Sequence, residues 1–262
     1  MPTLMPIDFF IFLTSIIFPM FGQGGGVVYV PLFCFKGFAF YSAVAISQSL
    51  IFVSAMSAMI TYHRAKMISW LLFFLVEFPT MLGAFVGGML SSWIPVVFAK
   101  VLLAGFVFIS GIKMFRSEDN LSNEDDFLMI EHVKNNLIRM CIGMLGMFAA
   151  GTVAGLLGIG GGVIKVPVMI LFMRIPAKIA VGTSGLMVGL TAISGLLGQA
   201  QVGHLPPVKV IWIYWILAFC GAQIGSKIAS RLSGQHYKRY LGILLMGLAI
   251  LFLLIPSFSN KI

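Results

Sequence analysis

Eight long apolar stretches follow one another along this chain, and each approaches or reaches the roughly 20 residues that a membrane-spanning helix needs. Only 10% of the 262 residues are charged, whereas a soluble domain carries about a quarter. Such a chain cannot cover itself with a water-compatible surface. The sequence therefore predicts an all-α, polytopic membrane protein, with apolar segments at residues 7–21, 43–60, 70–90, 96–112, 137–157, 180–197, 208–226 and 241–255.

The remaining composition bounds the compartment and the partners. Residues 1–10 carry Asp8 as their only charge, so the first segment lacks the basic start of a cleaved signal peptide and is expected in the mature protein. The net charge of +9 comes from Lys and Arg that mostly flank apolar segments, which favours lipid headgroups or an anionic substrate over nucleic acid. The three cysteines, Cys34, Cys141 and Cys220, have no metal-ligand spacing, so we expect packing residues, no metal and no cofactor.

One pattern occurs twice in the chain. Residues 22–31, Gly-Gln-Gly-Gly-Gly-Val-Val-Tyr-Val-Pro, recur 136 positions later as residues 158–167, Gly-Ile-Gly-Gly-Gly-Val-Ile-Lys-Val-Pro. With a shift of two further positions, Gly83 and Gly87 fall on Gly221 and Gly225. Internal repetition of this kind predicts two homologous halves.

The repeat divides the chain into a first membrane repeat at 1–115 and a second at 137–262, joined by a polar linker at 116–136. Six of the eight acidic residues lie in that linker. Asp8 and Glu77 are the other two, and Glu77 alone lies within an apolar segment away from the N-terminus. The linker is therefore expected to be solvated and the rest of the chain to be embedded.

The paired G-x-G-G-G-x-x-x-x-P elements, each opening a set of apolar segments in a chain of this size, resemble the TauE/SafE family of membrane permeases over residues 9–254. The resemblance implies a multi-pass protein of the bacterial inner membrane that transports small sulfur oxyanions or organosulfonates, such as sulfite or sulfoacetate. It leaves open which anion is carried, whether it is imported or exported, whether protons or Na⁺ are coupled to it, and whether the protein forms a homo-oligomer.

The glycine triplets predict two interrupted helices. Each glycine costs about 1 kcal/mol relative to alanine in a helix, and Pro31 and Pro167 disfavour an unbroken helix further. Broken backbone is tolerated at membrane depth only where protein or a wet cavity surrounds it, and exposed amides at a half-helix start favour an anion. We therefore expect a substrate site between the two triplets, formed by Gly24, Gly25, Gly26, Gly160, Gly161 and Gly162. Tight helix crossing without a ligand is the alternative explanation of these glycines.

The Lys and Arg residues favour one topology over another. If all eight segments crossed the membrane, 16 basic residues outside the motifs would divide 8 against 8. If the Gly-rich segment of each half forms a re-entrant hairpin followed by three crossings, they divide 12 against 4, which the positive-inside rule favours. Three crossings per half also make the repeats inverted, with both termini outside. Eight crossings with parallel repeats remain the alternative.

Two charged residues are functional candidates. Lys165 lies within the second glycine motif, at the position that Tyr29 has in the first. We expect its positive charge to attract the anionic substrate. Its alternative role is a lysine that reaches the membrane interface along its stem. Glu77 lies near the centre of an apolar segment, where a charge costs at least about 2.5 kcal/mol. We expect the Glu77 carboxyl group to couple transport to protons by changing its protonation, and a neutral acid with a structural role is the alternative.

Four polar residues occupy matching positions after the two motifs, namely Ser47 and Gln48 in one half and Thr183 and Ser184 in the other. Their hydroxyl and amide donors suit the oxygens of an oxyanion, and interhelical hydrogen bonding is the alternative. Gln23 is a further substrate-binding candidate. Because Ile159 stands opposite it, a symmetric pair of amide contacts is excluded.

Other function classes find less support. The chain has no Gly-x-Ser-x-Gly or His-Glu-x-x-His pattern, so an intramembrane enzyme is disfavoured. An anion channel lined by glycine amides remains an alternative to a carrier. The sequence favours a secondary permease for a small anion.

Overall fold

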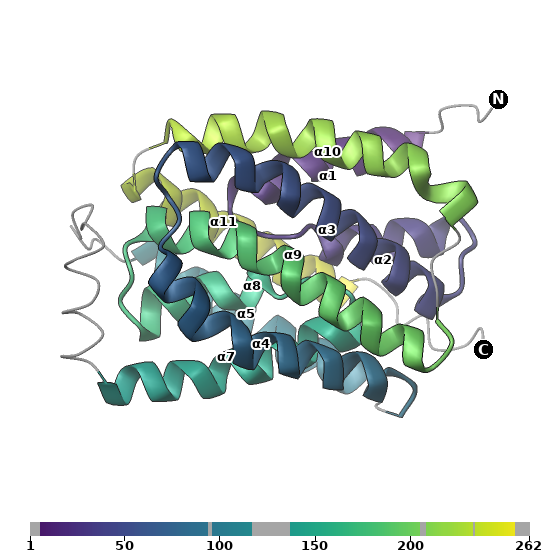
Figure 1. Ribbon diagram of the computed structural model, residues 1–262, viewed down its shortest axis with the longest axis horizontal. Helices are drawn as coiled ribbons and strands as arrows, with labels where there is room; N and C mark the ends of the chain where they lie inside the picture. The colour runs from purple at the N-terminus through teal and green to yellow at the C-terminus, as the bar shows by residue number, and fades with distance from the viewer. Residues whose placement is uncertain (1–5, 94–95, 117–136, 205–207, 233, 255–262) are drawn as a thin grey trace.

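The computed structural model describes residues 6–93, 96–116, 137–204, 208–232 and 234–254 (Figure 1). These residues form helices and short connections without a strand, so the predicted all-α class is confirmed. The predicted linker lies outside the described residues, apart from Arg116. In chain order the helices are α1 (Pro6–Met20), α2 (Gly26–Phe35), α3 (Phe40–Arg64), α4 (Trp70–Met89), η1 (Leu90–Ser92), α5 (Val96–Arg116), α7 (Leu137–Leu157), α8 (Gly162–Pro167), η2 (Val168–Phe172), α9 (Ala177–Gln201), α10 (Val208–Ser230) and α11 (Gly234–Leu254).

Several of these helices have the length and composition of membrane spans. Among the described residues, α3, α4, α9 and the Ile211–Ser230 part of α10 are long and apolar enough to cross a bilayer. Large apolar side chains also face outward, including Phe74 and Phe78 of α4, which are 70% and 67% exposed. An exposed apolar surface of this kind is stable in lipid and not in water.

Both Gly-rich motifs interrupt a helix, as predicted. α1 ends at Met20 and α2 begins at Gly26, while α7 ends at Leu157 and α8 begins at Gly162. The residues just before the new helices, Gly25 and Gly161, have φ angles of 71° and 76°. These angles lie in the left-handed region, which glycine adopts without the steric cost of a Cβ.

After each break the chain turns back along the helix it has just left. Ser15 of α1 is hydrogen-bonded to Tyr29 of α2 (2.8 Å), and Asp8 near the start of α1 is paired with Lys36 at the end of α2. In the second half, Gly143 of α7 lies against Met173, just beyond η2. Each half therefore consists of a helical hairpin followed by three long helices.

Each half contributes its first helix to a contact with a helix of the other half. Gly83 and Gly87 of α4 lie against the backbone of α7, and an added Cβ at Gly87 would be 2.0 Å from the carbonyl oxygen of Thr152. The matching glycines of α10, Gly221 and Gly225, lie against α1 in the same way. The first helix of each half thus packs on the second of the three long helices of the other half, which Figure 1 shows as α1 beside α10 and α7 beside α4.

Contacts between α3 and α9 define the centre of the molecule and the chain directions. Gln48 of α3 lies against Gly195 of α9, and Tyr62 lies against Gly185, so these two corresponding helices run antiparallel. By contrast α4 runs parallel to α9, because Ser69 is hydrogen-bonded to Thr183 and Ser91 to Gln199. The α3 and α9 helices pack on each other between the α1–α10 pair and the α4–α7 pair (Figure 1).

Candidate functional site

The two helix breaks lie against each other between the halves. An ideal Cβ on Gly26 would lie 2.2 Å from the carbonyl oxygen of Gly158, and one on Gly162 would lie 2.6 Å from that of Gly22. Ordinary contacts of a Cβ begin at 3.4 Å, so a larger residue cannot take either place without movement. The two motifs therefore meet backbone to backbone, a contact that both the substrate-site hypothesis and the alternative of tight helix crossing predict.

Two branched side chains close the space over both breaks. An ideal Cβ on Gly24 would lie 2.6 Å from Cγ2 of Ile51 and 2.8 Å from Cγ1 of Val188, and Gly160 approaches the same two residues. Ile51 belongs to α3 and Val188 to α9. Because glycine lets these side chains approach so closely, the centre is closed in this conformation, and a solute can enter only if α3, α9 or the hairpins move.

Hydroxyl groups from each half hold the broken backbone of the other. Ser47 Oγ donates to the carbonyl oxygen of Gly158 (2.7 Å), and Ser184 Oγ donates to that of Gly22 (2.8 Å). Both serines are fully buried. A carbonyl that a helix break leaves without an intrahelical donor is thus satisfied across the interface.

The other two matched residues also have protein partners. Gln48 Nε2 donates to the carbonyl oxygen of Gly155 (3.2 Å), and Thr183 Oγ1 accepts a hydrogen bond from the backbone amide of Ser69 (3.0 Å). In this conformation the donors of Ser47, Gln48 and Ser184 are therefore used between helices rather than left free for a solute. The oxygen Oε1 of Gln48 has no partner among the described residues.

Lys165 and Glu77, which the sequence offered as separate candidates, form one buried ion pair. Lys165 Nζ donates to Glu77 Oε2 at 2.8 Å, and the two side chains are 0% and 3% exposed. Thr191 of α9 completes the cluster, because its Oγ1 donates to Glu77 Oε1 (2.8 Å) and accepts from Lys165. The lysine is held in the interior directly beside the second break, since its Cε lies 3.5 Å from the Cβ position of Gly161.

The first half has a neutral cluster in the place of this ion pair. Tyr29 stands where the second half has Lys165, and its phenol is bonded to Ser15. Ala55 stands where the second half has Thr191. The two breaks therefore share a backbone arrangement and differ in charge, because among the described residues the Lys165–Glu77 pair lies behind the second break and Tyr29 and Ser15 lie in the matching place behind the first.

Beside the first break lies a small cavity of about 10 Å³, lined by Gln23, Gly24, Ser54 and apolar neighbours that include Ile51 and Val188. Gln23 and Ser54 are each 2% exposed. Neither polar atom of the Gln23 amide, nor Oγ of Ser54, has a hydrogen-bond partner among the described residues. Buried polar groups are nearly always paired, so this cavity is an exception that calls for a functional explanation.

A second polar cluster lies at the end of the first hairpin. Lys36, which follows α2, is paired with Asp8 and donates to the hydroxyl of Tyr214, and that hydroxyl donates to Asp8 Oδ1 (3.1 Å). Burial by itself lowers the pKa of the Lys36 ammonium, but its hydrogen bonds to Asp8 and Tyr214 outweigh burial, so the pKa lies above its ordinary value of 10.5. The ammonium therefore stays charged and fixes α2 to α1 and α10.

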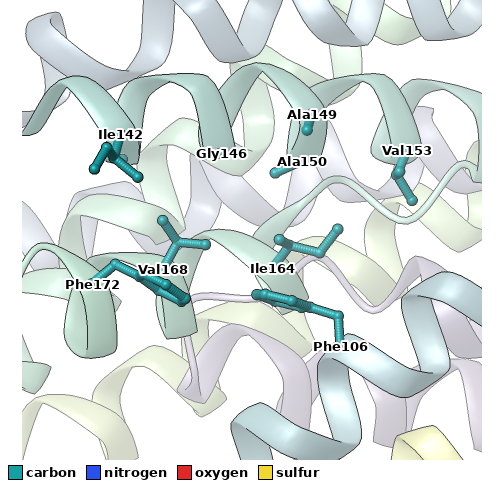
Figure 2. Close-up of a pocket in the computed structure, with 10 residues that line it drawn as sticks. Phe106, Ile142, Gly146, Ala149, Ala150, Val153, Ile164, Val168 and Phe172 are labelled. Carbon is teal, nitrogen blue, oxygen red and sulfur yellow. The ribbon is translucent and has the colours of Figure 1, made fainter. Parts of the chain in front are cut away.

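A larger, apolar cavity lies apart from these polar groups. It has a volume of about 290 Å³ and is lined by α5, α7, α8 and η2. Figure 2 shows its side chains, with Phe106 and Phe172 below and Ile142 and Val153 above, and no nitrogen or oxygen among the sticks. Such a lining provides no hydrogen-bonding group for an anion.

Sequence comparison of the halves missed two of these residues. Ser54 and Thr191 are polar residues within apolar segments, which is the signal that could have found them, but their counterparts are Leu190 and Ala55. A search for matched polar pairs therefore passes over both. In the described part of the chain, no group of three His, Cys, Asp or Glu side chains lies close enough to hold a metal ion.

Comparisons with known proteins agree with this architecture. The sequence model of the family described as sulfite exporter TauE/SafE matches residues 9–252. The probable membrane transporter protein YunE of Bacillus subtilis is 27% identical over 233 residues, which cover 82% of each chain. A probable membrane transporter protein of Methanocaldococcus jannaschii is 25% identical over 262 residues, or 92% of each chain, and one of Xylella fastidiosa is 26% identical over 239 residues, or 88% of this chain and 87% of that protein. No solved structure matches the chain significantly.

Proposed function

Because the chain belongs to the TauE/SafE family of membrane transporters, we propose that it is a secondary permease for small sulfur oxyanions or organosulfonates. The family and the relatives are transporters and not enzymes, and the protein is a multi-pass integral membrane protein. The name of the family mentions sulfite export. We place its substrate site between the two Gly-rich breaks and the protein in a bacterial inner membrane.

The observation that supports it best is the meeting of two broken helices at the interface between the halves. Gly26 lies against Gly158, and Gly162 against Gly22, with no room for a side chain. The first amides of a helix have no acceptor within it. In α2 these are the amides of Gly26 and Val27, because the amides of Val28 and Tyr29 donate to the carbonyl oxygen of Gly25. Separation of the breaks would present the first two amides to an anion from one side of the membrane at a time.

We propose further that the halves are inverted repeats, each a re-entrant hairpin followed by three crossings. The antiparallel pairing of α3 and α9 supports this arrangement. Arg239, near the start of α11, lies over the ring of Phe115, which precedes Arg116 at the end of α5. Arg116 and Arg239, two of the twelve basic residues that re-entrant hairpins would place on one side, therefore lie at the same end of the molecule. The positive-inside rule assigns that end to the cytoplasm, and inverted repeats of this kind provide alternating access.

The ion pair supports coupling of transport to protons. Glu77 on α4 and Lys165 on α8 are each neutralised by the other. A proton arriving at Glu77 would cancel its charge and leave Lys165 as a free cation beside Gly161, ready to attract an anion. Loss of that proton would restore the pair and expel the anion. Glu77 is then the coupling group and Lys165 the counter-charge of the substrate.

The test is a counterflow assay with purified protein in proteoliposomes, using sulfite, sulfoacetate, taurine, thiosulfate and sulfate in turn. We expect saturable counterflow of at least one sulfur oxyanion or sulfonate. Electrogenic conduction without saturation would instead identify an anion channel, and no movement of any anion would refute the proposal.

Variants test the two charged residues separately. Lys165→Met is expected to reduce anion uptake at least tenfold, whereas Lys227→Met, at an exposed lysine of α10, should leave it unchanged. Glu77→Gln is expected to remove the dependence of uptake on a pH gradient while counterflow persists. Retention of the pH dependence in Glu77→Gln would refute its coupling role, and a shift to dependence on Na⁺ would identify another coupling ion.

A further inference from the structure

The small cavity beside the first break contains the least satisfied polar groups of the described chain. Three of its polar atoms, Nε2 and Oε1 of Gln23 and Oγ of Ser54, are buried without a hydrogen-bond partner in the described residues. Ser54 lies beside the phenol of Tyr29 but makes no hydrogen bond of ordinary geometry. A buried polar group left unpaired destabilises the protein, so two neighbouring residues of this kind indicate a binding role.

The cavity lies next to the start of α2. Gln23 and Gly24 line the cavity, and α2, ten residues long, begins two residues later at Gly26. The amides at that end carry the positive end of the helix dipole. The side-chain amide of Gln23, before α2, and the hydroxyl of Ser54, on α3, therefore offer hydrogen-bond donors to one cavity in the field of that dipole.

No charged side chain lines this cavity. Its lining consists of Gln23, Ser54, glycines and apolar residues, and the nearby ionic residues Lys165 and Glu77 cancel each other. The cost of bringing an ion into a medium of low dielectric constant rises with the square of its charge, so a dianion costs about four times as much as a monoanion of equal size. The dipoles, together with Lys165 as the single cation that protonation of Glu77 would free, compensate one negative charge far better than two.

We propose that, once movement of α3, α9 or the hairpins enlarges this cavity of about 10 Å³, Gln23, Ser54 and the start of α2 form the recognition site of the permease, and that this site selects singly charged oxyanions over doubly charged ones. This proposal rests on the proposed transport function. It adds Ser54 as a substrate-binding residue and a preference for anions of a single charge. The site is single, because the second half has Ile159 in place of Gln23 and Leu190 in place of Ser54. The substrate is therefore held asymmetrically, against the first half.

The first experiment measures KM and thermal stability together for Ser54→Ala and Gln23→Leu in proteoliposomes and detergent. Loss of one neutral hydrogen bond should raise KM about threefold to tenfold, while stability stays equal or rises because an unpaired polar group is removed. The matched control is Ser57→Ala, one turn further along α3, whose hydroxyl donates to Phe219 O (2.7 Å). Its stability should fall and its KM should not change.

The second experiment compares two tetrahedral anions of similar size as competitors of transport, methanesulfonate with one charge and sulfate with two. Methanesulfonate should inhibit at a concentration at least 100-fold lower than sulfate, and Gln23→Glu, which places a carboxylate in the cavity, should abolish this inhibition. Equal inhibition by both anions would overturn the preference for a single charge.

The outcomes separate the two proposals. Counterflow by the wild type with an unchanged KM in both Ser54→Ala and Gln23→Leu would overturn the recognition site and leave the transport function standing. Absence of saturable counterflow for every anion would overturn the transport function and this site with it.

Discussion

Replacement of Gly26 by alanine tests the contact between the two helix breaks directly. The new methyl carbon would lie 2.2 Å from the carbonyl oxygen of Gly158, where contacts normally begin at 3.4 Å. The obstacle is backbone, so the hairpins must separate by about 1 Å, and overpacking of this kind costs about 1–3 kcal/mol. We expect a loss near 2 kcal/mol, or about 4–8 °C in the thermal midpoint for a chain of this approximate size.

A graded series of alanine variants isolates the clash from other effects of adding a methyl group. Gly24→Ala meets only the side chains of Ile51 and Val188, which can rotate, so its loss should be smaller. Gly105→Ala in α5 meets nothing within 4 Å and should be neutral, or stabilising by up to about 1 kcal/mol from helix propensity. Thermal denaturation in detergent, followed by tryptophan fluorescence, gives the midpoints.

The transport of Gly26→Ala gives a second readout. Since the methyl group wedges the breaks apart, the closed conformation is penalised and the turnover number should fall more than substrate affinity. If Gly26→Ala has the midpoint and the turnover of Gly105→Ala, the two breaks are not in contact in the folded protein, and the central site as described is wrong.

Three further predictions follow from the same interface. Lys165→Met alone should destabilise the protein by about 3–5 kcal/mol because Glu77 is left buried and unpaired, and a midpoint in the Glu77→Gln/Lys165→Met double variant no higher than in Lys165→Met would contradict this coupling. Ser47→Ala and Ser184→Ala should each cost about 1–3 kcal/mol by leaving a buried carbonyl unpaired, as measured by thermal denaturation against Ser57→Ala. Burial lowers the pKa of His204 below 6.5, so the unfolded chain binds its proton first as the pH falls, and stability should decrease from about pH 7.5 to about pH 5.5. In His204→Phe, which keeps the stack on Tyr41, that decrease should become smaller.

Much of the fold could be predicted from the sequence because its signals are local or repeated. The apolar segments follow from composition, and the helix breaks follow from glycine triplets that carry the same flanking Val and Pro. The alignment of Gly83 and Gly87 with Gly221 and Gly225 extended the repeat, and in the structure both pairs pack on the first helix of the other half. Repetition made these glycines recognisable.

The site was harder to predict because its contacts join residues that are far apart in the chain. Lys165 and Glu77 are separated by 88 positions, and nothing in either local sequence indicates that each neutralises the other. For Ser47 and Ser184 the sequence left open an anion contact and an interhelical hydrogen bond, and in this conformation both are bonded to the backbone of the opposite half. Only a packing arrangement reveals which donors are already used.

The exchange of first helices between the halves has a consequence for biosynthesis. Ser15 of α1 meets its neighbour Gly221 of α10 only after most of the polypeptide has left the ribosome. Until α10 is synthesised, the surface of α1 that packs on α10 must contact lipid or other helices. The glycines of α4 are in the same position until α7 is inserted. Assembly of this protein is therefore completed late, and a fragment that stops before α10 lacks the main packing partner of its own N-terminal helix.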